Sequence, residues 1–152
     1  MSWLRAGFEP PARLDLESGH HLRPIRGDDV GIDYPAVMGS RASLWARYGE
    51  AWGWPPATMT VEQDREDLLR HEQEIAAQET FNYAVLDAAE SELLGCVYID
   101  PPEDGSPAGT DAVVSWWLVD AMAGSDLERA LAEALPAWLH DVWGFRSVHV
   151  WP

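Results

Sequence analysis

Two side chains that can bind an amine and accept its proton stand at the end of one predicted strand, Tyr98 and Asp100. Successive side chains of a strand point to opposite faces, so these residues, two positions apart, share a face. A phenol and a carboxylate on one face form a candidate site for acid–base chemistry on an amine. The alternative is structural: Tyr98 belongs to the sheet, and Asp100 belongs to the turn that follows it.

The later strands carry further candidates. His149 lies on the last predicted strand and is a third candidate base, because imidazole takes up a proton near neutral pH; the alternative is a structural histidine. Ser115 lies among large apolar residues, where a buried hydroxyl needs either a ligand or a backbone partner. Trp116 and Trp117 point to opposite faces, so one is expected in the core and the other, Trp117, at a substrate pocket.

The segment over residues 49–59 is a loop rich in Trp, Gly and Pro. It either folds back over the core or forms a wall of a substrate cleft. In the second case Trp54 contacts the substrate.

Other chemistries are excluded by residue type or spacing. The chain has no lysine, so it cannot form a Schiff base or a phosphate-binding loop of the Gly-Lys type. No histidine has a partner at a recognised ligand spacing, so we expect no metal site. Cys96 lies in an apolar run and has no second cysteine to pair with, which predicts an inert thiol in a reducing compartment, the cytoplasm.

The chain of 152 residues carries a formal charge of -16, and the charge is uneven. Residues 1–58 are close to neutral, and residues 59–152 hold nearly all of the excess acid. A negative surface argues against nucleic acid and favours cationic ligands. No stretch approaches the ~20 apolar residues of a membrane span, so no membrane partner is expected.

The periodicity of apolar residues predicts one domain over 19–152, preceded by an arm over 1–18 that contains Pro10-Pro11. Two helices are marked by capping residues, Thr60 with Gln63 and Ser125 with Glu128. Pro136 is expected to kink the second of these helices. The predicted elements are a strand over 20–26, a broken helix over 30–48, a helix over 60–79, strands over 81–86, 93–99 and 112–119, a helix from Ser125 to Gly144, and a strand over 145–151.

The order of these elements resembles that of the GNAT superfamily of N-acetyltransferases. The hairpin over 81–99, with Leu94-Gly95-Cys96-Val97-Tyr98-Ile99 followed by Pro-Pro, is similar to the second and third strands of the family. The stretch over 21–25, His-Leu-Arg-Pro-Ile, resembles the first strand, and 60–79 resembles the preceding helix of one bacterial branch. The resemblance implies an α/β (α+β) fold, with a mixed, mainly antiparallel sheet flanked by helices and shortened after the fifth strand.

The resemblance also implies a place for acetyl-CoA. In the family, the pantetheine arm lies along the fourth strand, here 112–119, and the pyrophosphate lies on the turn before the next helix, here 120–125. This turn departs from the family pattern, because it has a single glycine, no basic residue and an aspartate at each end. The implied cofactor-binding residues are Leu118, Val119, Met122, Gly124, Ser125 and Arg129.

Two functions follow from this reading. The first is transfer of an acetyl group from acetyl-CoA to a small, cationic amine, with Tyr98, Asp100 and His149 as catalytic candidates and Trp54, Ser115 and Trp117 at the substrate. The second is a GNAT-like binding or interaction module without activity. A homodimer is compatible with both.

Overall fold

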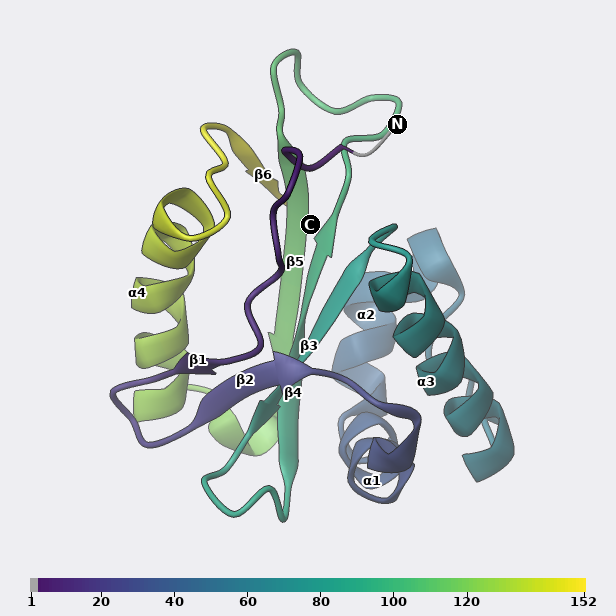
Figure 1. Ribbon diagram of the computed structural model, residues 1–152. Helices are drawn as coiled ribbons and strands as arrows, with labels where there is room; N and C mark the ends of the chain where they lie inside the picture. Colours follow the sequence, from purple (N-terminus) through teal and green to yellow (C-terminus); the bar gives the residue numbers. More distant parts are fainter. Residues whose placement is uncertain (1–2) are drawn as a thin grey trace.

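Six strands form a single sheet in which the spatial order equals the order along the chain (Figure 1). The computed structural model describes residues 3–152. All neighbouring strands are antiparallel except the last two, which are parallel. The strands are β1 (Leu14–Asp15), β2 (His21–Pro24), β3 (Phe81–Leu86), β4 (Leu93–Asp100), β5 (Ala112–Leu118) and β6 (Val148–Val150). This mixed, mainly antiparallel sheet with helices on both faces confirms the predicted fold class.

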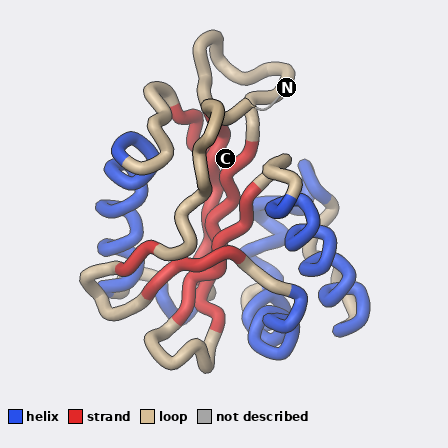
Figure 2. Tube along the Cα trace, in the orientation of Figure 1, coloured by secondary structure: helices blue, strands red, loops and turns tan. Residues whose placement is uncertain are grey.

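Helices cover both faces of the sheet. The helices α1 (Val30–Gly39), α2 (Arg41–Trp52) and α3 (Val61–Ala76) lie on one face, and α4 (Asp126–Asp141) lies on the other (Figure 1, Figure 2). The central strands β3 and β4 are therefore buried on both sides, which explains why they contain long apolar runs instead of a polar–apolar alternation.

The helix signals in the sequence are largely confirmed. Thr60 and Gln63 form the predicted capping box at the start of α3. Ser125 caps α4 by accepting from the Glu128 N–H, but the Glu128 carboxylate accepts from the Gly124 N–H, one residue before the position of a standard capping box. Helix α4 runs without interruption through Pro136.

The sheet separates two apolar cores. One core lies between the sheet and α4 and contains Val97 and Ile99 of β4. The other lies between the sheet and α1–α3 and contains Cys96 and Tyr98, the alternate residues of the same strand. Successive side chains of β4 thus point to opposite faces of the sheet, as predicted, and the candidate residue Tyr98 lies on the face that carries three helices.

The N-terminal arm is docked along the α4 side of the molecule. The Trp3 indole donates to the Gln78 carbonyl at 3.1 Å, and its ring stacks on Phe145 at 5.8 Å. Arg5 donates to the Trp143 carbonyl at 2.8 Å. The two residues of β1 then add an edge strand to β2, which the sequence did not predict because so short a strand has no alternation to detect.

The edge of β5 is only partly covered by β6. The two strands are paired over Ala112–Val114, and the Trp151 N–H adds a bond to the Val114 carbonyl at 2.8 Å. Within residues 3–152 no strand pairs with this edge beyond Val114. Because backbone groups alternate along a strand, the N–H and C=O groups of Trp116 and Leu118 point toward this open edge.

Candidate active site

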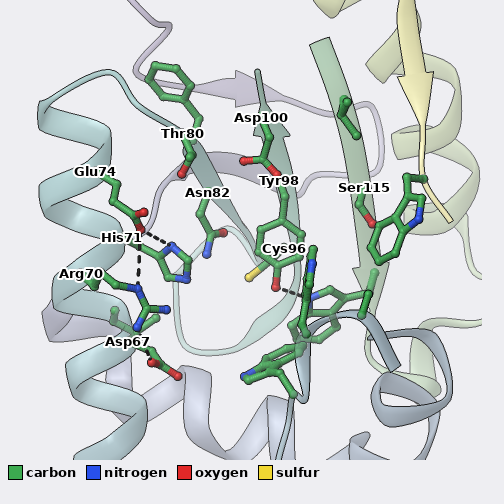
Figure 3. A pocket seen from close by; sticks show the side chains of 18 of the residues that line it. Asp67, Arg70, His71, Glu74, Thr80, Asn82, Cys96, Tyr98, Asp100 and Ser115 are labelled. Atoms are coloured by element: carbon green, nitrogen blue, oxygen red, sulfur yellow. Dashed lines mark hydrogen bonds and ion pairs between the residues drawn. The ribbon is translucent and has the colours of Figure 1, made fainter. Parts of the chain in front are cut away.

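A cavity of about 910 Å³ lies on the face of the sheet that carries α1–α3 (Figure 3). Side chains of α3 form one wall, and side chains of β3, β4 and β5 form the other. The acidic residues of the lining are Asp33, Asp64, Asp67, Glu74, Asp100 and Glu103. The lining contains one arginine, Arg70, which is already paired with Asp67 at 2.9 Å and Glu74 at 3.8 Å. The cavity therefore has a negative electrostatic potential.

Asp100, the last residue of β4, lies at one end of this cavity (Figure 3). Burial, with smaller contributions from the charges of Glu103 and Glu74, raises the pKa of Asp100 to about 7. A carboxyl group with such a pKa exchanges protons near neutral pH, which is what a general base for an ammonium substrate requires.

Tyr98 lines the same cavity, and its hydroxyl is held from one side. The Trp117 indole N–H donates to the Tyr98 hydroxyl at 2.8 Å. Burial is the main cause that raises the pKa of Tyr98 well above its ordinary value. The phenol is therefore neutral at physiological pH, so it can donate a proton or a hydrogen bond but cannot serve as the base.

Ser115 has a side-chain partner from a helix. Its hydroxyl shares a hydrogen bond of 2.7 Å with the hydroxyl of Tyr48, a fully buried residue of α2. Arg47 donates to the same Tyr48 hydroxyl at 3.2 Å. The partner of Ser115 is thus a tyrosine side chain, which links β5 to α2 at the point where the β5 edge opens.

Aromatic rings enclose one end of the cavity. Trp54 and Trp117, both predicted at the substrate, line it and lie 6.2 Å apart between ring centroids. Trp52 stacks on Tyr48 at 4.3 Å and contacts Trp151 at 5.3 Å. The Trp-rich segment therefore forms a wall of the cavity.

The middle of the cavity carries buried polar atoms without partners. Asn82 is 3% exposed, and its Oδ1 accepts no hydrogen bond from the described residues. Its register partner in the sheet is Tyr98. His71 Nδ1 also lacks a hydrogen bond; it lies 3.5 Å from Glu74, outside hydrogen-bond geometry. Burial, followed by the charge of Arg70, lowers the pKa of His71 to about 4, so the ring is neutral at pH 7.

Two aspartates meet at the other end of the cavity. Asp33 of α1 and Asp64 of α3 are 3% and 2% exposed, and their carboxyl groups are within hydrogen-bond reach of one another. Burial is the main cause that raises the pKa of both, and the neighbouring carboxyl adds to the effect on Asp33. No donor from the described residues reaches Asp64 Oδ2.

A second hollow, of about 460 Å³, lies beside the open edge of β5. Residues of α2, including Ala46 and Arg47, form one side of it. Leu118 and Val119, predicted to contact the cofactor, form the other side. Trp117 lines both this hollow and the larger cavity, so the two spaces adjoin at this residue.

The turn predicted to hold a pyrophosphate uses most of its N–H groups internally. Gly124 adopts the left-handed conformation with φ of 73°, and its N–H donates to the Glu128 carboxylate at 3.1 Å. The N–H groups of Met122, Ala123 and Ser125 donate to carbonyls within the same turn. Arg129, the predicted counter-charge, is paired with Asp126 at 2.9 Å.

The remaining candidate, His149, lies on β6 in register with Val113 and is not part of the cavity lining. Cys96 lines the cavity, and burial raises the pKa of its thiol well above the ordinary value. Across residues 3–152, no three His, Cys, Asp or Glu side chains are grouped so that they could hold a metal ion. Within the same residues, no helix has the length and apolar character needed to cross a membrane.

Several cavity residues carried no signal that sequence analysis could use. Asp33 is one polar residue of α1, and Asp64 and His71 belong to the charged stretch of α3, where the sequence does not distinguish them from exposed residues. Only the packing of α1 against α3 brings them to one cavity. Asn82 was detectable as the single polar residue of a buried strand. Tyr48 and Trp151 were not detectable, because neither belongs to a motif.

The architecture of residues 3–152 is that of the GNAT acetyltransferases, as superposition on solved structures shows. The ribosomal-protein-S5-alanine acetyltransferase of Vibrio fischeri superposes with a TM-score of 0.71 at 17% sequence identity, covering 92% of this chain and 73% of the other. RimL, a ribosomal L7/L12 acetyltransferase in complex with coenzyme A, gives a TM-score of 0.66 at 16% identity, covering 84% and 67%.

A third structure of this kind is MccE, a microcin C7 self-immunity acetyltransferase in complex with acetyl-CoA and AMP. It superposes with a TM-score of 0.67 at 11% identity, covering 87% of this chain and 68% of the other. No protein-family model and no curated protein sequence matches the chain. At these identities the likeness establishes the fold, and the activity has to be argued from the site.

Proposed function

We propose that this protein transfers an acetyl group from acetyl-CoA to a small, cationic amine. The observation that carries the proposal is that the acidic cavity and the second hollow adjoin at Trp117 of β5. The acidic cavity suits a cationic acceptor, and the hollow beside the open β5 edge lies where the GNAT fold holds its donor. Trp117 lines both spaces, so an acceptor and a donor bound in them would meet at this residue.

The residues of the cavity can carry out the proton transfers that the reaction needs. Acetyl-CoA would supply an acetyl group activated as a thioester. Asp100, ionised above about pH 7, takes a proton from the bound ammonium and leaves a nucleophilic amine. Tyr98 stays neutral and can donate a hydrogen bond. The aromatic wall of Trp54 and Trp151 keeps water from the reacting groups.

The described residues fit one part of acetyl-CoA better than another. The open backbone groups of Trp116 and Leu118 can pair with an extended pantetheine arm as an added strand would. The turn fits a pyrophosphate poorly. The Gly124 N–H already donates to Glu128, and the carboxylates of Asp120 and Asp126 repel an anion. Arg47, at the rim of the hollow, is a cation that the sequence did not suggest.

Glu128→Gln is expected to tighten acetyl-CoA binding by about two- to fivefold, since one charge at a helix N-terminus is worth about 0.3–1 kcal/mol. The substitution removes a negative charge beside the phosphates. Isothermal titration calorimetry with acetyl-CoA measures the change. Glu133→Gln, on the exposed face of the same helix, is the control. Weaker binding by Glu128→Gln would mean that the carboxylate supports the site.

Filling the second hollow tests the proposed function directly. Ala46→Trp places an indole in the hollow and is expected to weaken acetyl-CoA binding at least tenfold and to reduce acetyl transfer in parallel. Ala42→Trp, an exposed position of the same helix outside the hollow, is the matched control. Transfer is followed as thiol release from acetyl-CoA with a panel of primary amines. The absence of both binding and transfer at millimolar acetyl-CoA would refute the function.

The second candidate, a binding module without activity, is favoured by one observation. The bond from the Gly124 N–H to Glu128 removes a phosphate donor that the fold ordinarily offers. The same titration separates the two functions, because the module would bind cationic ligands in the cavity and would not bind acetyl-CoA.

A further inference from the structure

The Asp33–Asp64 pair lies at the end of the cavity opposite Asp100, and one of its oxygen atoms, Asp64 Oδ2, has no hydrogen-bond partner among the described residues. Two carboxyl groups within hydrogen-bond reach cannot both be ionised inside a protein unless a cation lies beside them. In the absence of a cation they share a proton. No other donor among the described residues reaches Asp64 Oδ2, so a proton or a ligand must satisfy this oxygen.

The cavity is elongated, with carboxyl groups at both ends. Along α3, Asp64 and Glu74 are ten positions apart, which corresponds to about 15 Å of helix. Along β4, Cys96 and Asp100 are four positions apart, which corresponds to about 13 Å of strand. The charges of Asp33 and Asp64 act on the Cys96 thiol. Asp33 and Asp64 therefore lie at one end, and Asp100 lies at the other.

A separate observation in the middle of the cavity indicates a ligand with N–H donors. Asn82 is 3% exposed, its side chain points into the cavity (Figure 3), and its Oδ1 has no partner among the described residues. Asn82 pairs with Tyr98, which lies between Cys96 and Asp100 on β4, so it is placed between the two ends. An unpaired buried acceptor carries a free-energy cost that an N–H donor from a ligand removes. A ligand that spans the cavity would pass this oxygen.

We propose that the Asp33–Asp64 pair binds a second ammonium group of the substrate, so that the acceptor is a linear amine with a cation at each end. One ammonium lies beside Asp100, where it loses a proton and reacts. The other replaces the proton shared by Asp33 and Asp64. The inference rests on the proposed function for the reacting end, but the binding of the second ammonium can be measured without acetyl-CoA.

The charges around the pair allow this exchange. Asp29, at the end of the 3-10 helix Gly27–Asp29 that precedes α1, is paired with Arg23 at 2.8 Å, and Asp67 of α3 is paired with Arg70 at 2.9 Å. On β4, the side chains of Cys96 and Tyr98 are neutral, and His71 of α3 is neutral as well. Arg23 and Arg70 are thus each paired with a carboxylate other than Asp33 and Asp64. Binding of an ammonium by the pair releases a proton, so the affinity rises with pH.

Calorimetry with matched amines tests the proposal. In 150 mM salt and without acetyl-CoA, pentane-1,5-diamine is expected to bind at least about tenfold more tightly than pentylamine, because a charge-assisted hydrogen bond is gained. Propane-1,3-diamine and octane-1,8-diamine complete a length series, in which the affinity should peak. Titration in two buffers of different ionisation enthalpy measures the released proton. Equal affinity for mono- and diamines would overturn the proposal.

Substitutions assign the binding to the pair. Asp64→Asn keeps the shape and the hydrogen bond to Asp33, and should abolish both the preference for the diamine and the proton release. Asp33→Asn is the second variant and should give the same result if Asp64→Asn does not fold. Glu66→Gln, an exposed acid of α3, is the control and should leave binding unchanged. An undiminished preference in both aspartate variants would overturn the assignment.

The two proposals fail in different ways. Diamine binding that depends on Asp64, without any acetyl transfer, would refute the proposed function and leave this binding site standing. Acetyl transfer that is equally efficient with monoamines, and insensitive to Asp64→Asn, would refute the binding site and leave the function standing.

Discussion

Asp100→Asn is expected to lower kcat/KM for acetyl transfer by about a hundredfold or more, the usual contribution of a positioned general base. The amide keeps the size of the side chain but cannot accept a proton. In the unmodified protein, kcat/KM should fall tenfold per pH unit below about pH 7, because the Asp100 carboxyl is then protonated. The variant should lack this inflection.

A matched control accompanies this substitution. Asp104→Asn changes an exposed acid of the neighbouring loop that does not line the cavity, and should leave both rate and pH profile unchanged. Asp100→Asn would disprove the role of Asp100 as base if it retained the inflection and kept kcat/KM within threefold of the unmodified protein.

The same residue links stability to pH. The pKa of Asp100 is raised from 3.8 in the unfolded chain to about 7 in the folded protein, so the folded state binds the proton more tightly. The contribution of Asp100 to the free energy of unfolding is therefore fully present at low pH and is lost as the pH rises toward about 7. Asp100→Asn removes this loss, so an inactive variant that is more stable at pH 8 would agree with a functional role for the carboxyl.

Arg23→Met is expected to lower the free energy of unfolding by about 3–5 kcal/mol, because it leaves a buried carboxylate without its counter-charge. The guanidinium donates to both oxygens of Asp29, at 2.8 and 2.9 Å, and the two side chains are 9% and 7% exposed. Urea unfolding followed by circular dichroism measures the change. A loss below about 1 kcal/mol would contradict the assigned importance of this ion pair.

Two variants separate the ion pair from other effects. Arg13→Met breaks an exposed pair with Asp15 and should change stability by less than about 0.5 kcal/mol. Combining Arg23→Met with Asp29→Leu removes both charges, and should recover part of the stability lost by the single variant.

The elements of the fold could be predicted where local spacing defines them. The hairpin of β3 and β4, the capping box at Thr60 and the cap at Ser125 depend on residues close in sequence. The broken helix predicted over 30–48 is observed as α1 and α2, which are separated at Ser40. The short strand β1 could not be predicted, because it depends on pairing with β2. The spacing of seven residues between Val61 and Leu68 suggests one buried stripe on α3, but Val61 is 45% exposed while Leu68 is buried.

The candidate site was predictable only along the strands. Alternation placed Tyr98 and Asp100 on one face, and both line the cavity. The opposite wall comes from α1 and α3, and no sequence spacing relates Asp33 to Asp64. The cofactor turn illustrates a different limit: its acidic composition was visible in the sequence, but the use of the Gly124 N–H by Glu128 depends on a side-chain conformation.

The sheet separates the tryptophan side chains into two groups, so intrinsic fluorescence can report on each face of the sheet. Trp52, Trp54, Trp117 and Trp151 surround the cavity, whereas Trp3, Trp138 and Trp143 lie on the α4 side with the arm. Indole emission depends on local polarity, so a ligand in the cavity changes the fluorescence of the first group alone. Release of the arm changes that of the second, and single Trp→Phe substitutions would assign each signal to one face of the sheet.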